Sequence, residues 1–214
     1  MENKLNELKV EFQFNPPHAS NMGGAWERLI RSTKQILQGM GSKYIGRLCT
    51  SQLRTLFYET MAIMNCRPLG YVSEQQVPLC PNMLLTMKTD VVLPPPGTFE
   101  ESDIYSRKRW RVVQQLANEF WQRWRKEYLH TLQVRQKWVE KVPGVSVGDV
   151  VLVKEDCPRN SWPLARVVEC IESHDGEVRS VRLLIGKRHH LSDKCQYLDR
   201  PVTKIVVLVK AATG

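Results

Sequence analysis

The sequence predicts an α+β protein: a mostly helical N-terminal part, then a long basic helix, then a small antiparallel β-barrel. Three observations support this order. Apolar residues recur three or four positions apart after residue 24, as they do on one face of a helix. The same spacing returns, with many basic residues, from about residue 104. After Pro143-Gly144, short β-rich runs alternate with turn-forming residues, and four or five strands in so short a stretch suggest a small barrel.

The first elements follow from local patterns. Apolar and polar residues alternate over 8–14, which predicts a strand that ends at Pro16-Pro17. A helix is expected from near Gly24 to Gly39, where glycines return. Since the rest of residues 1–90 offers no other convincing strand, that strand lacks sheet neighbours, and residues 1–90 are interpreted as the second half of a larger domain.

A second helix is expected to be capped by Thr50 or Ser51 and to stop before Pro68, because proline has no amide proton and restricts the residue before it. Pro81 fits the first turn of a short third helix. The apolar side of the second helix is expected to carry Leu53, Leu56, Phe57, Met61 and Met64.

A proline-rich linker (91–103) precedes the long basic helix (104–142). Its apolar stripe consists of Trp110, Val113, Ala117, Phe120, Trp124 and Tyr128, which we interpret as core residues. Trp121 is off this stripe and is the better candidate for an interface. The flanking basic residues, which include Arg111, Arg123 and Arg125, are either a solvated face or phosphate contacts.

The small barrel is assigned to residues 143–210. Its first strand alternates Val150 and Leu152 with Val151 and Val153, as expected for a strand packed on both sides. Lys187 and Arg188 belong to a basic loop between strands. This loop is either an ordinary exposed turn or a phosphate contact.

Composition narrows the class of protein. Hydrophobic residues make up 42% and charged residues 25%, as in ordinary globular domains. No segment approaches the roughly 18 unbroken apolar residues of a membrane span. The N-terminus has no apolar core of a signal peptide, and the six cysteines form no CxxC pair. We therefore expect an intracellular protein of the nucleus or cytoplasm, neither secreted nor membrane-bound.

The charge indicates an anionic partner. The formal net charge is +9 and the isoelectric point about 9.4. Charge alone does not distinguish nucleic acid, acidic protein and a membrane surface.

One carboxylate stands out among the basic residues. Glu27, Arg31 and Lys34 share a helical face, with Arg28 beside them. One interpretation is an amphipathic helix with a solvated Glu27–Arg31 ion pair. The other places Glu27 on a divalent metal and the basic residues on phosphates, because magnesium prefers carboxylate and phosphate oxygens.

Several motifs favour the second interpretation. FNPPHASNMGGAWERLIRSTKQIL (14–37) closely resembles the glutamate segment of integrases from BEL/Pao-type LTR retrotransposons. MNCRPLGYVSE (64–74) and VPLCPNMLL (77–85) resemble the next two family segments, with Cys66 and Cys80 where Ser and Thr are expected. We interpret both cysteines as packing positions. The resemblance continues through the long helix and the small domain, and covers residues 8 to 209.

The resemblance implies a fold and a chemistry. The fold is the C-terminal half of a ribonuclease-H-like core, a long helix and an SH3-like barrel. In the family, two Asp and one Glu hold two Mg²⁺ or Mn²⁺ ions that activate water or a DNA 3′-hydroxyl. Glu27 matches the third carboxylate, and Arg31 and Lys34 match DNA-contacting positions. Asn15 matches the rim of the active site. The implied partners are non-specific DNA and further copies of the chain, without a small-molecule cofactor.

Both family aspartates should precede the glutamate, yet no Asp occurs among the 26 residues before Glu27. One carboxylate is a poor site for two metal ions. We therefore expect a DNA-binding fragment that neither cuts nor joins DNA alone. The alternative is a host-retained module that contacts chromatin or protein, in which Glu27 has no role.

Overall fold

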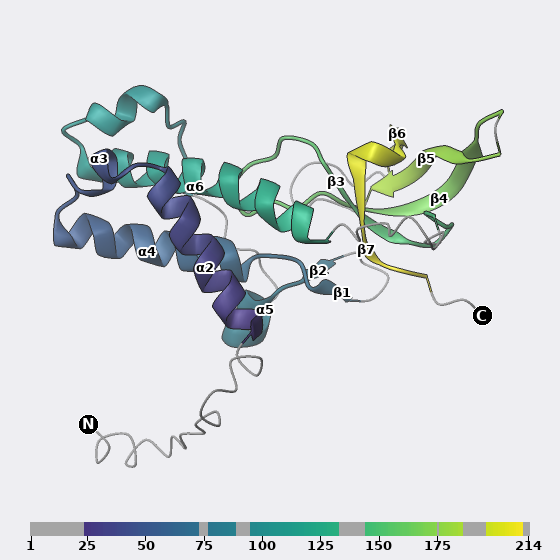
Figure 1. Cartoon of the computed structure of the whole chain (residues 1–214), viewed down its shortest axis with the longest axis horizontal. Helices are drawn as coiled ribbons and strands as arrows, with labels where there is room; N and C mark the ends of the chain where they lie inside the picture. Colours follow the sequence, from purple (N-terminus) through teal and green to yellow (C-terminus); the bar gives the residue numbers. More distant parts are fainter. Residues whose placement is uncertain are drawn as a thin grey trace, which may run out of the picture.

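The computed structural model describes residues 24–72, 77–88, 95–132, 144–174, 176–185 and 196–211. Helices gather at one end and a five-stranded antiparallel sheet at the other, and α6 (Arg109–Leu132) runs from one to the other (Figure 1). The α+β prediction is confirmed at this level. The strand expected over 8–14 lies outside the described residues.

The first helices are close to their predicted positions. Helix α2 spans Gly24–Gly39, a short α3 spans Ser42–Ile45, and α4 spans Thr50–Asn65. The N-cap of α4 is Cys49 rather than Thr50 or Ser51. Its backbone N–H donates to the Gln52 side chain over 3.0 Å, so the helix starts one residue earlier than hydroxyl preference suggests.

The buried side of α4 differs from the expectation. Leu56, Thr60 and Ile63 are buried, whereas Phe57 and Met61 are 46% and 56% exposed. Successive helical residues are about 100° apart, so Phe57 and Met61 lie on the flank of the stripe that packs against α6. The apolar side of α4 is therefore wider than the part of it that contacts α6.

A hairpin not anticipated from sequence follows α4. Strands β1 (Gly70–Val72) and β2 (Val77–Leu79) pair antiparallel. Helix α5 (Pro81–Thr86) begins at Pro81, as predicted. The two cysteines interpreted as packing positions, Cys66 and Cys80, are 3% and 4% exposed.

The long helix is shorter at its start than predicted. A 3₁₀ helix, η2 (Glu101–Tyr105), occupies residues assigned partly to the linker and partly to the helix, and α6 begins at Arg109. Residues 133–142 of the expected helix are outside the described part. Except for exposed Trp110, the apolar stripe is buried as predicted. Phe120 stacks on Trp124, and Trp124 on Tyr128, with ring centroids 6.4 and 5.8 Å apart.

The sheet has the order β6-β5-β4-β3-β7, and every neighbouring pair is antiparallel. The last two strands are joined by a single 3₁₀ turn, η3. The elements are β3 (Val150–Val153), β4 (Leu164–Glu172), β5 (Val178–Ile185), β6 (Gln196–Pro201), η3 (Val202–Lys204) and β7 (Ile205–Val209).

Strand β3 is buried on both faces, as its sequence predicted. Val150 and Leu152 join the core that contains α6, while Val151 and Val153 join a second core between the strands. Strand β3 therefore links the sheet to the long helix. Trp162, before β4, packs edge-on against Trp121 and Tyr128 and closes this junction.

Candidate nucleic-acid interface

The face of α2 that was predicted to bind metal and phosphate is open to solvent. Glu27 is in the first turn, and Glu27, Arg31 and Lys34 are all exposed. With 3.6 residues per turn, these three positions lie within about 60° of each other around the helix axis. Arg28 is exposed as well, about 100° around the axis from Glu27.

Ionic contacts on this face differ from the simplest expectation. Among the described side chains, none forms an ion pair with Glu27, and the Glu27–Arg31 pair is therefore absent from this part of the structure. A carboxylate in the first turn is stabilised by the positive end of the helix dipole. The neighbouring cations remain available to an external anion.

The described residues supply no cluster of metal ligands around Glu27. Within the described ranges, no group of three His, Cys, Asp or Glu side chains could hold a metal ion. Glu27 therefore belongs to no such group in the part of the chain that the structure describes. Asn15, Lys187 and Arg188 lie outside the described residues, so their assignments stay predictions.

Arg123 was predicted to contact nucleic acid, but it has an internal partner. Its Nη2 lies 2.6 Å from Glu119 Oε1, one turn earlier on α6. Its Nη1 would be 3.1 Å from a Cβ added at Gly39, so the guanidinium also packs against the end of α2. Since the pair is partly exposed, Arg123 is a weaker candidate for a phosphate contact than Arg31 or Lys34.

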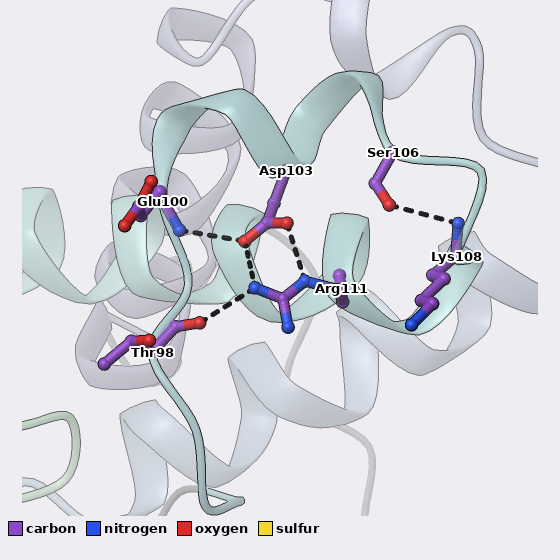
Figure 2. Close-up of polar contacts among 6 residues, drawn as sticks. All are labelled: Thr98, Glu100, Asp103, Ser106, Lys108 and Arg111. Atoms are coloured by element: carbon purple, nitrogen blue, oxygen red, sulfur yellow. Dashed lines mark hydrogen bonds and ion pairs between the residues drawn. The ribbon is translucent and has the colours of Figure 1, made fainter.

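Arg111 also has partners within the chain (Figure 2). Its Nε and Nη2 donate to the two oxygens of Asp103 over 2.6 and 2.9 Å, and Nη2 also donates to the Thr98 carbonyl. The guanidinium lies over the Phe99 ring, 5.5 Å from its centroid. This fork fastens the segment before α6 to the helix.

The Asp103–Arg111 pair changes the acidity of its carboxyl group. Hydrogen bonds from Arg111, together with the Glu100 N–H, hold the pKa of Asp103 below its ordinary value. Asp103 is therefore ionised wherever α6 is folded at neutral pH, and Arg111 is committed to it.

Several cations of the sheet are paired in the same way. Arg182 contacts Glu169 and Asp199, and Arg200 contacts Glu155. Arg182 and Arg200 are therefore already neutralised by carboxylates of the chain.

Lys154 and Lys204 form a basic pair that the sequence analysis missed. The Lys154 N–H donates to the Lys204 carbonyl over 2.9 Å, and its Nζ donates to Thr203 O over 3.0 Å. Burial, together with the charge of Lys204, lowers the pKa of Lys154. The pairing of β3 with β7 brings these residues together, so only knowledge of the strand order would have revealed them.

An apolar surface lies beside the ionic face of α2. Trp26 and Ile30 are 54% and 50% exposed, one turn apart on α2, and Phe57 and Met61 are similarly spaced on α4. Thr33 of α2 donates to Met64 Sδ of α4 over 2.9 Å, so the two helices touch just after these residues. We call these four residues the apolar face of α2 and α4; Leu84, Leu85 and Met87 in and after α5 are exposed too.

The comparisons with known proteins bear on the C-terminal half. The model of a protein family described as "Family of unknown function (DUF5641)" matches residues 108–208. The matched stretch runs from the residue before α6 into β7, so it contains α6 and strands β3 to β6 whole. No curated protein and no solved structure matches the chain. In the described part, no helix is long and apolar enough to span a membrane.

Proposed function

We propose that the chain is a fragment of a BEL/Pao-type retrotransposon integrase that binds DNA without sequence specificity. The observation that carries the proposal is the face of α2, where Arg31 and Lys34 are exposed beside Glu27 without an internal partner among the described residues. Phosphates of a DNA strand would contact these two cations and displace counterions. Lys187 and Arg188 are proposed as additional contacts.

The apolar face of α2 and α4 supports the half-domain part of the proposal. Its four large side chains are each about half exposed, and exposed apolar patches are typical of surfaces that another segment or chain covers. In a ribonuclease-H-like core, the central sheet covers helices of this kind. We infer that the missing half of the core would pack on this face and bring its two aspartates to Glu27.

The strand order supports an SH3-like barrel. In such barrels the last strand pairs with the first, after a single 3₁₀ turn, as β7 pairs with β3 after η3. The curled sheet encloses its own small core, with Val151, Val167 and Val181 inside. Small barrels of this kind in integrases bind DNA or chromatin.

Catalysis is not proposed for this chain by itself. Glu27 would contribute one oxygen ligand to a pair of Mg²⁺ or Mn²⁺ ions, which need further carboxylates. We expect no nicking of supercoiled DNA by the purified chain in either metal, and nicking that Glu27→Gln abolishes would contradict this.

A second candidate function rests on the same apolar face. Exposed aromatic and aliphatic side chains rimmed by charge are typical of protein interfaces. The alternative is therefore a module that contacts chromatin or another protein. In this alternative, Glu27 has no catalytic role.

A pair of double variants separates the two functions. Arg31→Gln with Lys34→Gln removes two cations from the α2 face, whereas Arg54→Gln with Lys88→Gln removes two exposed cations elsewhere. We expect the first pair to weaken binding of a fluorescent DNA duplex about tenfold and the control pair to have little effect. Equal losses in both variants, or in neither, would contradict a contact at α2.

A further inference from the structure

A cavity of about 500 Å³ lies between the second half of α6, the segment before η2 and the loop from β3 to β4. This volume is within the range of small-molecule sites. Phe99 and Trp121 supply aromatic walls, and Asn118 and Gln122 supply polar ones. Three cations line it: Arg125, Lys126 and Arg159. The acid in its wall is Asp156.

Arg125 places positive charge in this cavity without a close acidic partner. Its side chain is 11% exposed, and its Nη2 donates to the backbone carbonyls of Val153 and Glu155. Asp156 is 3.9 Å from its Nη1, but the Asp156 side chain is fully exposed, so water screens the pair. Arg125 Nε is buried and has no hydrogen-bond partner among the described atoms.

Arg159 adds a second, more deeply buried charge. Its side chain is 2% exposed, and most of its partners are neutral: the Gln114 carbonyl, the Gln114 side chain and Asn118 Oδ1. Glu59 Oε2 is 3.5 Å from its Nη2. Arg159 Nε is buried without a described partner. Burial lowers the pKa of Arg159, and the charge of Glu59 opposes this only in part.

These contacts leave the cavity positively charged. Among the described residues, three cations and one exposed carboxylate line the wall, and Glu59, 3.5 Å from Arg159, is not part of the lining. Buried charges without full compensation are costly, and a cleft with low-dielectric walls concentrates their field. An anion in the cavity would lower that cost. Guanidinium groups match phosphate oxygens especially well.

We propose that this cavity binds a phosphate group, carried either by a free nucleotide or by a nucleic-acid backbone. Arg125 and Lys126 contact the phosphate, and Arg159 supplies buried positive charge behind it. Phe99, which is half-buried, is the aromatic wall residue that would contact a base. The site is separate from the α2 face, so it can fail while DNA binding at α2 stands, and the reverse also holds.

The test uses the full chain and the fluorescence of its tryptophans, one of which is in the cavity wall. Adenosine 5′-monophosphate, adenosine, inorganic phosphate and a short single-stranded oligonucleotide are titrated separately. We expect adenosine 5′-monophosphate to bind and adenosine to bind at least about tenfold more weakly, because the phosphate supplies the charge contacts. Binding of the oligonucleotide alone would assign the site to a nucleic-acid backbone.

Two variants make the test specific. Lys126→Glu and Gln122→Glu each change an exposed cavity residue, so the fold should survive, and each should weaken the phosphate ligand about tenfold. Lys88→Glu makes the same charge change as Lys126→Glu, but away from the cavity, and should have little effect. The proposal is overturned if none of the phosphate ligands binds, or if the cavity variants bind like the control.

Discussion

At the residue scale, contacts within the chain decide which cations remain available to an external anion. Arg111, Arg123 and Arg125 were all grouped with the basic flank of the long helix, yet each has an internal partner. Sequence spacing predicted that these residues lie on a helix surface. It could not predict which carboxylates and carbonyls the surrounding segments would bring to them. Arg31 and Lys34 are exposed, and no acid of the described residues forms an ion pair with either.

Asp149 is the clearest buried charge at this scale. It is 0% exposed, and its oxygens accept hydrogen bonds from the Ser146 and Ala211 backbone and from Lys210 Nζ over 2.9 to 3.0 Å. Gly148, at φ +93°, makes the turn that aims this carboxylate back at the chain. Burial alone would raise the pKa of Asp149, but these hydrogen bonds outweigh it and lower the pKa.

Asp149→Asn is expected to reduce the free energy of unfolding by about 1–3 kcal/mol at neutral pH, because one buried donor loses its charged acceptor. A lowered folded-state pKa contributes stability that is present above the unfolded value of 3.8 and lost as pH falls through the folded value. The variant should therefore lose less stability than the wild type below pH 3.8, where Asp103 also contributes to the pH dependence.

Urea unfolding at several pH values measures both effects. Asp156→Asn is the matched control, since its side chain is fully exposed, and it should change stability by no more than about 0.5 kcal/mol. Identical pH profiles for Asp149→Asn and the wild type would show that this carboxylate does not stabilise the fold through its charge.

At the element scale, α6 holds the helical part and the sheet together. One side of the helix packs on α2 and α4, while Trp121, Trp124 and Leu129 reach the core shared with β3, β4 and β7. Trp121 was predicted as a candidate interface residue, but it is buried inside the chain: its ring is 5.0 Å from Trp162, and its Nε1 donates to the Cys157 carbonyl. Periodicity could identify the stripe. It could not show that Trp162 and the neighbouring strands would cover the side next to the stripe.

Trp121→Ala should cost about 3–5 kcal/mol of stability, as expected when a large aromatic side chain is removed from a core. Trp110→Ala is the control on the same helix. Trp110 is 48% exposed and meets only the edge of the helical part, against Phe99, so about 1 kcal/mol is expected. Chemical unfolding followed by circular dichroism compares the two. Similar losses would contradict the assignment of Trp121 to the junction.

At the scale of the whole molecule, the sequence predicted the order of elements better than their boundaries. The helical part, the long helix and the small sheet occur in the expected order. The β1–β2 hairpin was missed because three-residue strands give no clear alternation. Helix α6 starts later than expected because the residues before it form a separate 3₁₀ helix, η2, which the Asp103–Arg111 contact joins to α6. Phe57 and Met61 were placed on the apolar side of their helix, yet both are about half exposed. An apolar pattern does not show whether another segment packs against it.

The apolar face of α2 and α4 gives a prediction at this scale. Replacing Phe57 and Met61 together with Ser should change the free energy of unfolding by less than about 1 kcal/mol, since both side chains are about half exposed. It should also lower the binding of a hydrophobic dye and reduce self-association in sedimentation. Leu56→Ser, at a fully buried neighbouring position, should instead cost several kcal/mol. Comparable losses in both would mean that the face belongs to a closed core.

The salt dependence of DNA affinity tests the central claim most directly. We expect log Kd for a duplex to rise linearly with log salt, and the Arg31→Gln, Lys34→Gln variant to flatten that slope by about 1.8, or roughly 0.9 for each lost phosphate contact. A slope near zero for the wild type, or an unchanged slope in the variant, would contradict DNA binding at the α2 face.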